Sequence, residues 1–199
     1  MHRVLRSPDV PAAELERLAG SPDHQGVVAE VDPYPYAGAG ELLGRRGGLL
    51  VALDQVQDPQ NLGAICRSAE AAEAGGVVIP ERRAASVTPA VVKASAGAVE
   101  HLGIARVRNL ADWLGEAREA GFWVWGADAG ADAAHTAVDL TGGLVLVLGA
   151  EGTGLRPRVA GACDGLLRIP QQGVVGSLNV SAAAAVLLFE ARRQRGEGP

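Results

Sequence analysis

Polar side chains that can bind charge or form directed hydrogen bonds stand in three loops built otherwise from small and apolar residues. Five of them stand out: Asn61 and Arg67 in the first loop, Glu151 in the second, and Ser177 and Asn179 in the third. A guanidinium stays charged at any working pH, and a carboxylate pairs with a cationic ligand or an arginine. Amide and hydroxyl groups hold a ligand or cap a helix. These types favour a ligand site that combines charge with hydrogen bonding.

Each polar residue also has an ordinary explanation. Asn61 stands near the start of an expected helix, where an asparagine cap is common. Arg67 emerges from a largely apolar helix, and a surface arginine with its stem along the helix is the better explanation on this loop alone. Ser177 and Asn179 can both be helix caps. A turn with an exposed side chain explains Glu151.

The loop around Glu151 is unusually rich in glycine. An apolar strand runs directly into "GAEGTG" at positions 149–154. Glycines allow close backbone approach and positive φ angles. The spacing matches neither GxGxxG nor GxxxxGK[ST], so it predicts neither a dinucleotide fold nor a P-loop. Glu151 would disfavour a phosphate and suits a cationic ligand or an arginine partner.

The last helix is apolar on every side. It is expected from Leu178 or Asn179 to Gln194, with four alanines at 182–185 followed by "VLLF". A helix without a polar face must be buried all round. This favours a subunit interface, where alanines such as Ala184 let another backbone come close; a central core helix is an equally good alternative.

Short apolar strands alternate with helices from Leu49 onward. Strands are expected at 49–54, 77–80, 104–107, 122–128, 143–149 and 166–170, and helices at 61–76, 88–97 (cap Thr88), 109–121 and 178–194. This alternation predicts an α/β fold with a parallel sheet covered on both faces. Such sheets bind ligands in the loops at the carboxyl ends of their strands, where the three polar loops lie.

The stretch before this region has a different character. A short amphipathic helix is expected at 11–20, a strand at 24–31, and a Pro- and Gly-rich linker at 32–48. These pieces are too few for an independent core. We expect residues 1–46 to be the end of a small domain plus a linker, and residues 47–199 to be the main domain.

Composition narrows the function classes. The 199 residues are 48% hydrophobic and 4% aromatic, with a net charge of −5. Few aromatics disfavour a base-stacking platform, and the negative charge means that any nucleic-acid contact needs a local basic patch. Candidates for such patches are Arg3, Arg6, Arg17, Arg45, Arg46, Arg82, Arg83, Lys93 and Arg106.

The cysteines, the histidines and the hydropathy pattern indicate the cellular compartment and whether a metal site is expected. Cys66 and Cys163 lie far apart without CxxC spacing, which is typical of free, buried thiols in a reducing compartment. The four histidines form no cluster with metal-ligand spacing. No apolar run approaches the length of a membrane span. We therefore expect a cytoplasmic protein without a metal.

Taken together and in this order, the three loops resemble the signature motifs of the SpoU (TrmH-like) family of RNA 2′-O-ribose methyltransferases. The matching stretches are "NLGAICRSAEAAEAGGVVIP" from Asn61, "LVLGAEGTGL" around Gly149, and "IPQQGVVGSLNVSAAAA" from Ile169. The resemblance covers about residues 49–195. "KASAGAVEHLGIARVRNL" (93–110) is similar to the branch that methylates guanosine in large-subunit (23S) ribosomal RNA, and 1–46 is similar to the end of that branch's L30e-like substrate-binding domain.

The resemblance implies a SPOUT fold with a C-terminal trefoil knot, S-adenosylmethionine as cofactor, RNA as substrate, and a homodimer with the last helix at its interface. It implies catalytic or supporting roles for Arg67, Glu151, Asn61, Ser177 and Asn179, with Arg67 near the partner's cofactor. It implies cofactor contacts from Gly149, Ala150, Gly152, Ile169, Ser177, Leu178 and Val180.

The expected activity is therefore transfer of a methyl group to a ribose 2′-OH, in the class of RNA (guanosine-2′-O-)-methyltransferases (EC 2.1.1.-). Alternatives are a transfer-RNA methyltransferase or a non-catalytic RNA-binding assembly protein with the same fold. A nucleotide-dependent oxidoreductase ranks far behind, because the GxGxxG turn is missing.

Overall fold

The structure, a computed structural model, describes residues 9–20, 22, 24, 26–44, 48–174 and 176–196. It divides into two compact units, Met1–Tyr34 and Pro35–Pro199. The first contains the expected short helix, α1 (Ala12–Ala19), which has no buried residue. The strand expected at 24–31 is wrong for the described residues of that stretch, because they have no neighbouring strand with which to pair.

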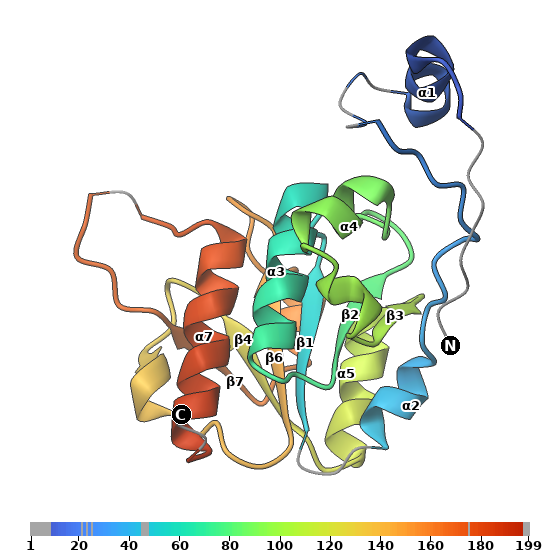
Figure 1. Ribbon diagram of the computed structural model, residues 1–199. Helices are drawn as coiled ribbons and strands as arrows, with labels where there is room; N and C mark the ends of the chain where they lie inside the picture. The colour runs from blue at the N-terminus through green and yellow to red at the C-terminus, as the bar shows by residue number, and fades with distance from the viewer. Residues whose placement is uncertain are drawn as a thin grey trace. The chain divides into compact units, whose positions relative to one another are not determined.

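The second unit is built on a parallel sheet of seven strands among the described residues (Figure 1). They are β1 (Leu49–Asp54), β2 (Gly76–Pro80), β3 (Ile104–Val107), β4 (Trp123–Ala127), β5 (Ala133–Ala134), β6 (Leu144–Gly149) and β7 (Gly165–Arg168). Their order is β3-β2-β1-β6-β4-β7-β5. All of β1 is buried, as a continuous apolar run between two covered faces requires.

Helices cover both faces of the sheet. One layer contains α3 (Pro59–Ala71), α4 (Pro89–Ala94), the short η1 (Ala98–Glu100) and α7 (Val180–Gln194), with α3 packed between α4 and α7 (Figure 1). The other contains α2 (Ala39–Leu43), α5 (Leu110–Glu119) and α6 (Pro157–Ala160); η2 (His135–Ala137) follows β5. Leu50 and Ala52 pack under this second layer, and their alternating neighbours face the first.

The start of α3 differs from the expectation. Asp58, not Asn61, caps the helix by accepting a hydrogen bond from the Gln60 N–H (2.9 Å), and Pro59 takes the first helical position. Asn61 therefore lies inside the first turn, and its side chain is available for other contacts. The helix also ends earlier than expected, at Ala71.

Part of the expected linker belongs to the main unit. Within it, α2 places Leu42 in the core, 4% exposed. The Trp113 indole N–H donates to the Ala39 carbonyl (3.3 Å), and Ala37 bridges to Ala105 beside β3. Residues 35–44 thus cover the β3 end of the sheet.

The last helix keeps an exposed apolar stripe. Its buried side consists of Val180, Ala184, Leu187, Leu188 and Ala191. Val186 (39% exposed) and Phe189 (52% exposed) face outward. Within the single chain α7 is therefore buried on one side only, and Ala184 packs in the chain's own core instead of facing outward. The subunit interface expected from the apolar helix stays a prediction.

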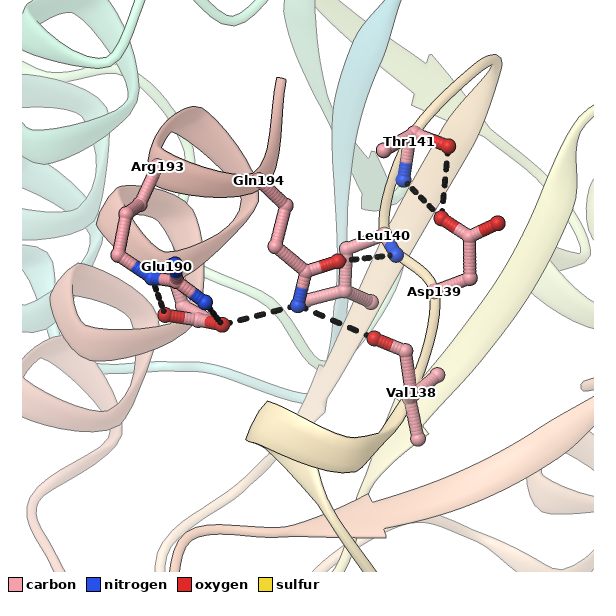
Figure 2. Close-up of polar contacts among 7 residues, drawn as sticks. All are labelled: Val138, Asp139, Leu140, Thr141, Glu190, Arg193 and Gln194. Carbon is pink, nitrogen blue, oxygen red and sulfur yellow. Dashed lines mark hydrogen bonds and ion pairs between the residues drawn. The ribbon is translucent and has the colours of Figure 1, made fainter. Parts of the chain in front are cut away.

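Hydrogen bonds join the C-terminal end of α7 to the segment before β6 (Figure 2). Gln194 accepts a hydrogen bond from the Leu140 N–H (2.9 Å) and donates to the Val138 carbonyl (3.1 Å). Glu190 accepts hydrogen bonds from Gln194 and Arg193, which lowers the pKa of its carboxyl from 4.5 to about 2. These bonds hold the end of α7 against the body of the unit.

No helix within the described ranges is long and apolar enough to cross a membrane.

Candidate functional site

A cavity of about 350 Å³ opens where β6, β4 and β7 end. These three strands are neighbours in the sheet, so the loops that follow them meet at one edge. All seven residues expected to bind a cofactor line the cavity: Gly149, Ala150, Gly152, Ile169, Ser177, Leu178 and Val180. They come from two loops that are about twenty residues apart in the sequence, and the sheet topology brings them together.

A third wall of the cavity follows β4, and its residues were not among those predicted from the sequence. Ala127, Asp128 and Ala129 line the cavity there. The signal was present, because Asp128 directly follows an apolar strand and the carboxyl ends of parallel strands meet at one edge. Asp128 accepts a hydrogen bond from the Gly130 N–H (2.7 Å).

The glycines of the second loop allow either a close backbone contact or a left-handed backbone conformation. A Cβ added at Gly149 would lie 2.2 Å from the Gly154 carbonyl carbon, because the loop folds back over the end of β6. Ala150 and Gly154 form a bridge that closes this fold. Gly152 (φ 77°) and Gly154 (φ 65°) take left-handed conformations. The tight loop thus presents its backbone to the cavity.

Three of the five polar residues are brought together by direct hydrogen bonds. The Asn61 Nδ2 donates to Glu151 Oε1 (3.0 Å), and the Asn179 Nδ2 donates to Asn61 Oδ1 (2.9 Å) and to Glu151 Oε1. The Val180 N–H also points to Glu151 Oε1 (3.4 Å). This triad of Asn61, Glu151 and Asn179 joins the ends of three segments that are remote in the sequence.

The direction of the triad follows from the cap of α7. Asn179 Oδ1 accepts from the backbone N–H groups of Ser181 (2.8 Å) and Ala182 (3.3 Å), so its Nδ2 must point to the triad. Because the Asn179 Nδ2 is a donor, Asn61 must turn its Oδ1 toward Asn179. The Asn61 Nδ2 then points to Glu151. Among the described residues, no group donates to the second carboxylate oxygen of Glu151, which leaves that oxygen for a ligand.

The other two candidates lie apart from the triad. Ser177 lines the cavity. Arg67 is exposed on α3, does not line the cavity, and makes no hydrogen bond or ion pair within the described ranges. Within one chain the structure therefore leaves Arg67 outside the cavity.

The charge of the cavity is negative. The carboxylates of Asp128 and Glu151 line it, and no Lys, Arg or His from the described part of the chain does. Ala127, Leu167, Ile169 and Leu178 add apolar surface. Such a lining suits a ligand with an apolar ring and a positive charge, and disfavours a phosphate-rich one.

An ion pair between the buried Asp54 and the exposed Arg156 supports the second loop. Asp54, fully buried at the end of β1, accepts hydrogen bonds from the backbone N–H (2.9 Å) and Nε (2.8 Å) of Arg156. Arg156 directly follows the loop that carries Glu151. The pair therefore fixes the position at which this loop returns to the sheet.

Apart from the cavity, neither the two cysteines nor the described metal-ligating side chains form another site suited to catalysis. Burial raises the pKa of both Cys66 and Cys163 to about 12, so neither is a ready thiolate. Both cysteines are free. Within the described ranges, no group of three His, Cys, Asp or Glu side chains could hold a metal ion.

The chain is similar in sequence to known methyltransferases. The chain is 43% identical over 187 residues to an uncharacterized tRNA/rRNA methyltransferase, slr0955, of Synechocystis; the match covers 92% of this chain and 49% of that protein. It is 44% identical over 191 residues to the putative TrmH family tRNA/rRNA methyltransferase YacO of Bacillus subtilis, covering 94% of this chain and 76% of that protein. The chain thus spans about half of the first relative and three quarters of the second.

A solved structure agrees with the sequence matches. The SpoU methyltransferase AviRb from Streptomyces viridochromogenes, in complex with the cofactor AdoMet, aligns with a TM-score of 0.71 at 35% identity, over 78% of this chain and 60% of that one. Residues 9–37 match a family described as RNA 2′-O ribose methyltransferase substrate binding. Residues 48–189, which contain β1 through most of α7 and the entire triad, match the SpoU rRNA Methylase family. The chain belongs to the SpoU rRNA methylase family.

Proposed function

We propose that this chain transfers a methyl group from S-adenosylmethionine to a ribose 2′-OH of structured RNA, with a guanosine of large-subunit ribosomal RNA as the target. The observation that carries the proposal is the triad of Asn61, Glu151 and Asn179 at the negatively charged cavity. The family match and the AdoMet-bound relative support the same activity.

The cavity fits this cofactor by its chemistry. S-adenosylmethionine combines an adenine ring with a positively charged sulfonium, and the cavity combines apolar walls with two carboxylates and no described cation. Backbone groups around Gly149, Ile169 and Leu178 would hold the adenine and ribose. The sulfonium supplies a methyl group that is already strongly electrophilic.

The protein's own residues then have to position the hydroxyl and manage its proton. Arg67 stays protonated and would bind the adjacent phosphate and stabilise the developing alkoxide. Glu151, held through Oε1 by the triad, would use its second oxygen to orient or accept the proton. Because Arg67 lies outside its own chain's cavity, it would act at the cavity of a partner in a homodimer.

Two finer features belong to the same proposal. The segments 149–155 and 169–180, which meet at the cavity, would form the trefoil knot that the resemblance to the SPOUT fold implies. The first unit, residues 1–34, would be part of an L30e-like substrate-binding domain, which the match at residues 9–37 supports.

The test is transfer of tritiated methyl groups from S-adenosylmethionine to purified ribosomal RNA and, separately, to transfer RNA, followed by nucleotide-resolved mapping of 2′-O-methylation. Arg67→Ala is expected to lower the transfer rate at least about a hundredfold, while calorimetry shows an unchanged Kd for the cofactor.

Arg158→Ala is the matched control, because it removes an exposed arginine from the opposite helix layer. An equal loss of cofactor binding in Arg67→Ala would contradict its role. Cofactor binding by the wild type without transfer to any RNA would favour the non-catalytic alternative, and transfer to transfer RNA alone would contradict the ribosomal target.

A further inference from the structure

The described arginines fall into three groups. Ion pairs with carboxylates hold Arg17, Arg118, Arg156, Arg158, Arg192 and Arg193. Hydrogen bonds to backbone carbonyls hold Arg106, Arg168 and Arg195. Among the arginines that the structure describes, those without a hydrogen bond or ion pair are Arg67, Arg82, Arg83 and Arg108. In a chain of net charge −5, an arginine without an internal partner is free to bind an external anion.

Three of these four arginines lie together. Arg82 and Arg83 follow Glu81 in the loop after β2, and Arg108 directly follows β3; all three are exposed. The ends of the two strands are paired, because Pro80 lies opposite Val107. We call Arg82, Arg83 and Arg108 the basic rim. Every strand of the sheet runs parallel, so the basic rim and the cavity lie on the same edge of the sheet.

The loop that carries the basic rim is held in place. The Val87 N–H donates to the Tyr36 hydroxyl (2.9 Å). The Arg106 guanidinium lies over the Tyr36 ring, 5.3 Å from its centroid, and donates to the Glu81 carbonyl (3.0 Å). Arg83 has a φ of 58°, a left-handed conformation that is rare for residues with a side chain and needs support from its surroundings. These contacts hold the backbone of the loop that carries Arg82 and Arg83.

We propose that the basic rim binds the phosphodiester backbone of the RNA whose ribose is methylated at the cavity; this rests on the proposed function. A guanidinium fork matches two phosphate oxygens. Glu81 is the one carboxylate in the described loop at 81–88 and the stretch 104–108, so the rim is strongly positive. None of the three rim residues is aromatic, and Arg106 already lies over the ring of the nearby Tyr36, so the rim is expected to bind phosphates without recognising base sequence.

The experiment replaces two rim arginines by glutamine in Arg82→Gln/Arg108→Gln. The control, Arg118→Gln/Arg158→Gln, removes the same charge from exposed arginines on α5 and α6. Fluorescence anisotropy measures binding of a fluorescein-labelled RNA hairpin at several salt concentrations, and methyl transfer is measured with the same RNA under saturating cofactor. Melting curves by circular dichroism establish that both variants are folded.

The rim variant is expected to bind the hairpin roughly tenfold more weakly than the control does, with a salt slope lower by about two, one for each lost phosphate contact. The KM for RNA should rise by a similar factor while kcat and the Kd for cofactor stay unchanged. Equal RNA affinity in the rim and control variants would overturn the basic rim.

Failure of the proposed function gives a different result. If the wild type transfers no methyl group, the anisotropy measurement still decides whether the rim binds RNA. If the wild type methylates RNA and both double variants have the same KM, the rim is overturned and the proposed function stands.

Discussion

Single side chains in this site serve structure and chemistry at once. Asn179 caps α7 through Oδ1 and donates to Asn61 and Glu151 through Nδ2. From the sequence, a cap and a part of a ligand site were both open explanations of Asn179, and the structure shows that the cap orients the amide for the triad. Asn61 differs, because Asp58 performs the capping and leaves the Asn61 side chain entirely to the triad.

The two duties of Asn179 can be separated by Asn179→Ser. Serine caps helices about as well as asparagine, so the free energy of unfolding should change by only a few tenths of a kcal/mol. The amide donor to Glu151 is lost, so methyl transfer should fall at least about tenfold. Urea unfolding and a transfer assay measure the two effects.

The chain offers a matched control for this variant. Asn109 caps α5 by accepting from the Ala111 N–H (3.2 Å), away from the cavity. Asn109→Ser should leave transfer unchanged. Equal activity in Asn179→Ser and Asn109→Ser would show that the triad does not contribute to the reaction.

At the scale of elements, the sheet and its supports place the loops. Buried strands such as β1 and β6 were predictable within a residue or two, because a continuous apolar run has few alternatives. The helix α2 was missed in a stretch rich in Pro and Gly, where local signals favour a loop. The strand order that brings Asn61 to Glu151 depends on long-range pairing, which hydrophobic periodicity does not contain. The glycine loops were expected at the carboxyl ends of the strands and do line the cavity there, whereas the Asp128 wall was overlooked.

The ion pair beneath the second loop can be tested against an exposed pair two residues away. Arg156 binds the fully buried Asp54, whereas Arg158 binds Asp112 at the surface, where the side chains are 72% and 60% exposed. Arg156→Ala removes the guanidinium from the fully buried Asp54 but keeps the backbone N–H bond of residue 156, so it should lower the free energy of unfolding by about 2 kcal/mol. Arg158→Ala should cost less than about 1 kcal/mol. Urea unfolding measures both, and equal losses would contradict a supporting role for the Asp54–Arg156 pair.

The end of α7 should respond to acid through Glu190. Hydrogen bonds from Arg193 and Gln194 lower the pKa of this carboxyl to about 2 in the folded chain, from 4.5 without them. A depressed pKa stabilises the fold above about pH 4.5, and this contribution is lost as the pH falls toward 2. Because Arg193 is 67% exposed, the contribution is about 1 kcal/mol or less.

Comparison of the wild type with Glu190→Gln by urea unfolding checks this effect. The difference in unfolding free energy should be largest near pH 6 and approach zero near pH 2. If the difference in unfolding free energy between the two proteins does not change with pH, the charge of Glu190 does not stabilise the end of α7.

At the scale of the whole molecule, the single chain has an exposed apolar stripe and an arginine outside its own cavity. Val186 and Phe189 are exposed on α7, and α3, which carries Arg67, packs against α7. Leaving this apolar surface in water is unfavourable. A homodimer through this layer would cover the stripe and bring each Arg67 toward the partner's cavity.

Mixing two inactive variants tests whether Arg67 serves the partner. Arg67→Ala and Glu151→Gln are each expected to be inactive alone. After unfolding and refolding together, about half of the dimers are mixed, and each mixed dimer pairs an intact Arg67 with an intact Glu151 at one of its two sites, so about one quarter of wild-type activity should return. If Arg67 served its own chain, no activity would return. Adding Val186→Glu to both variants should prevent both dimerisation, measured by light scattering, and recovery, because a charge would then lie on the apolar stripe.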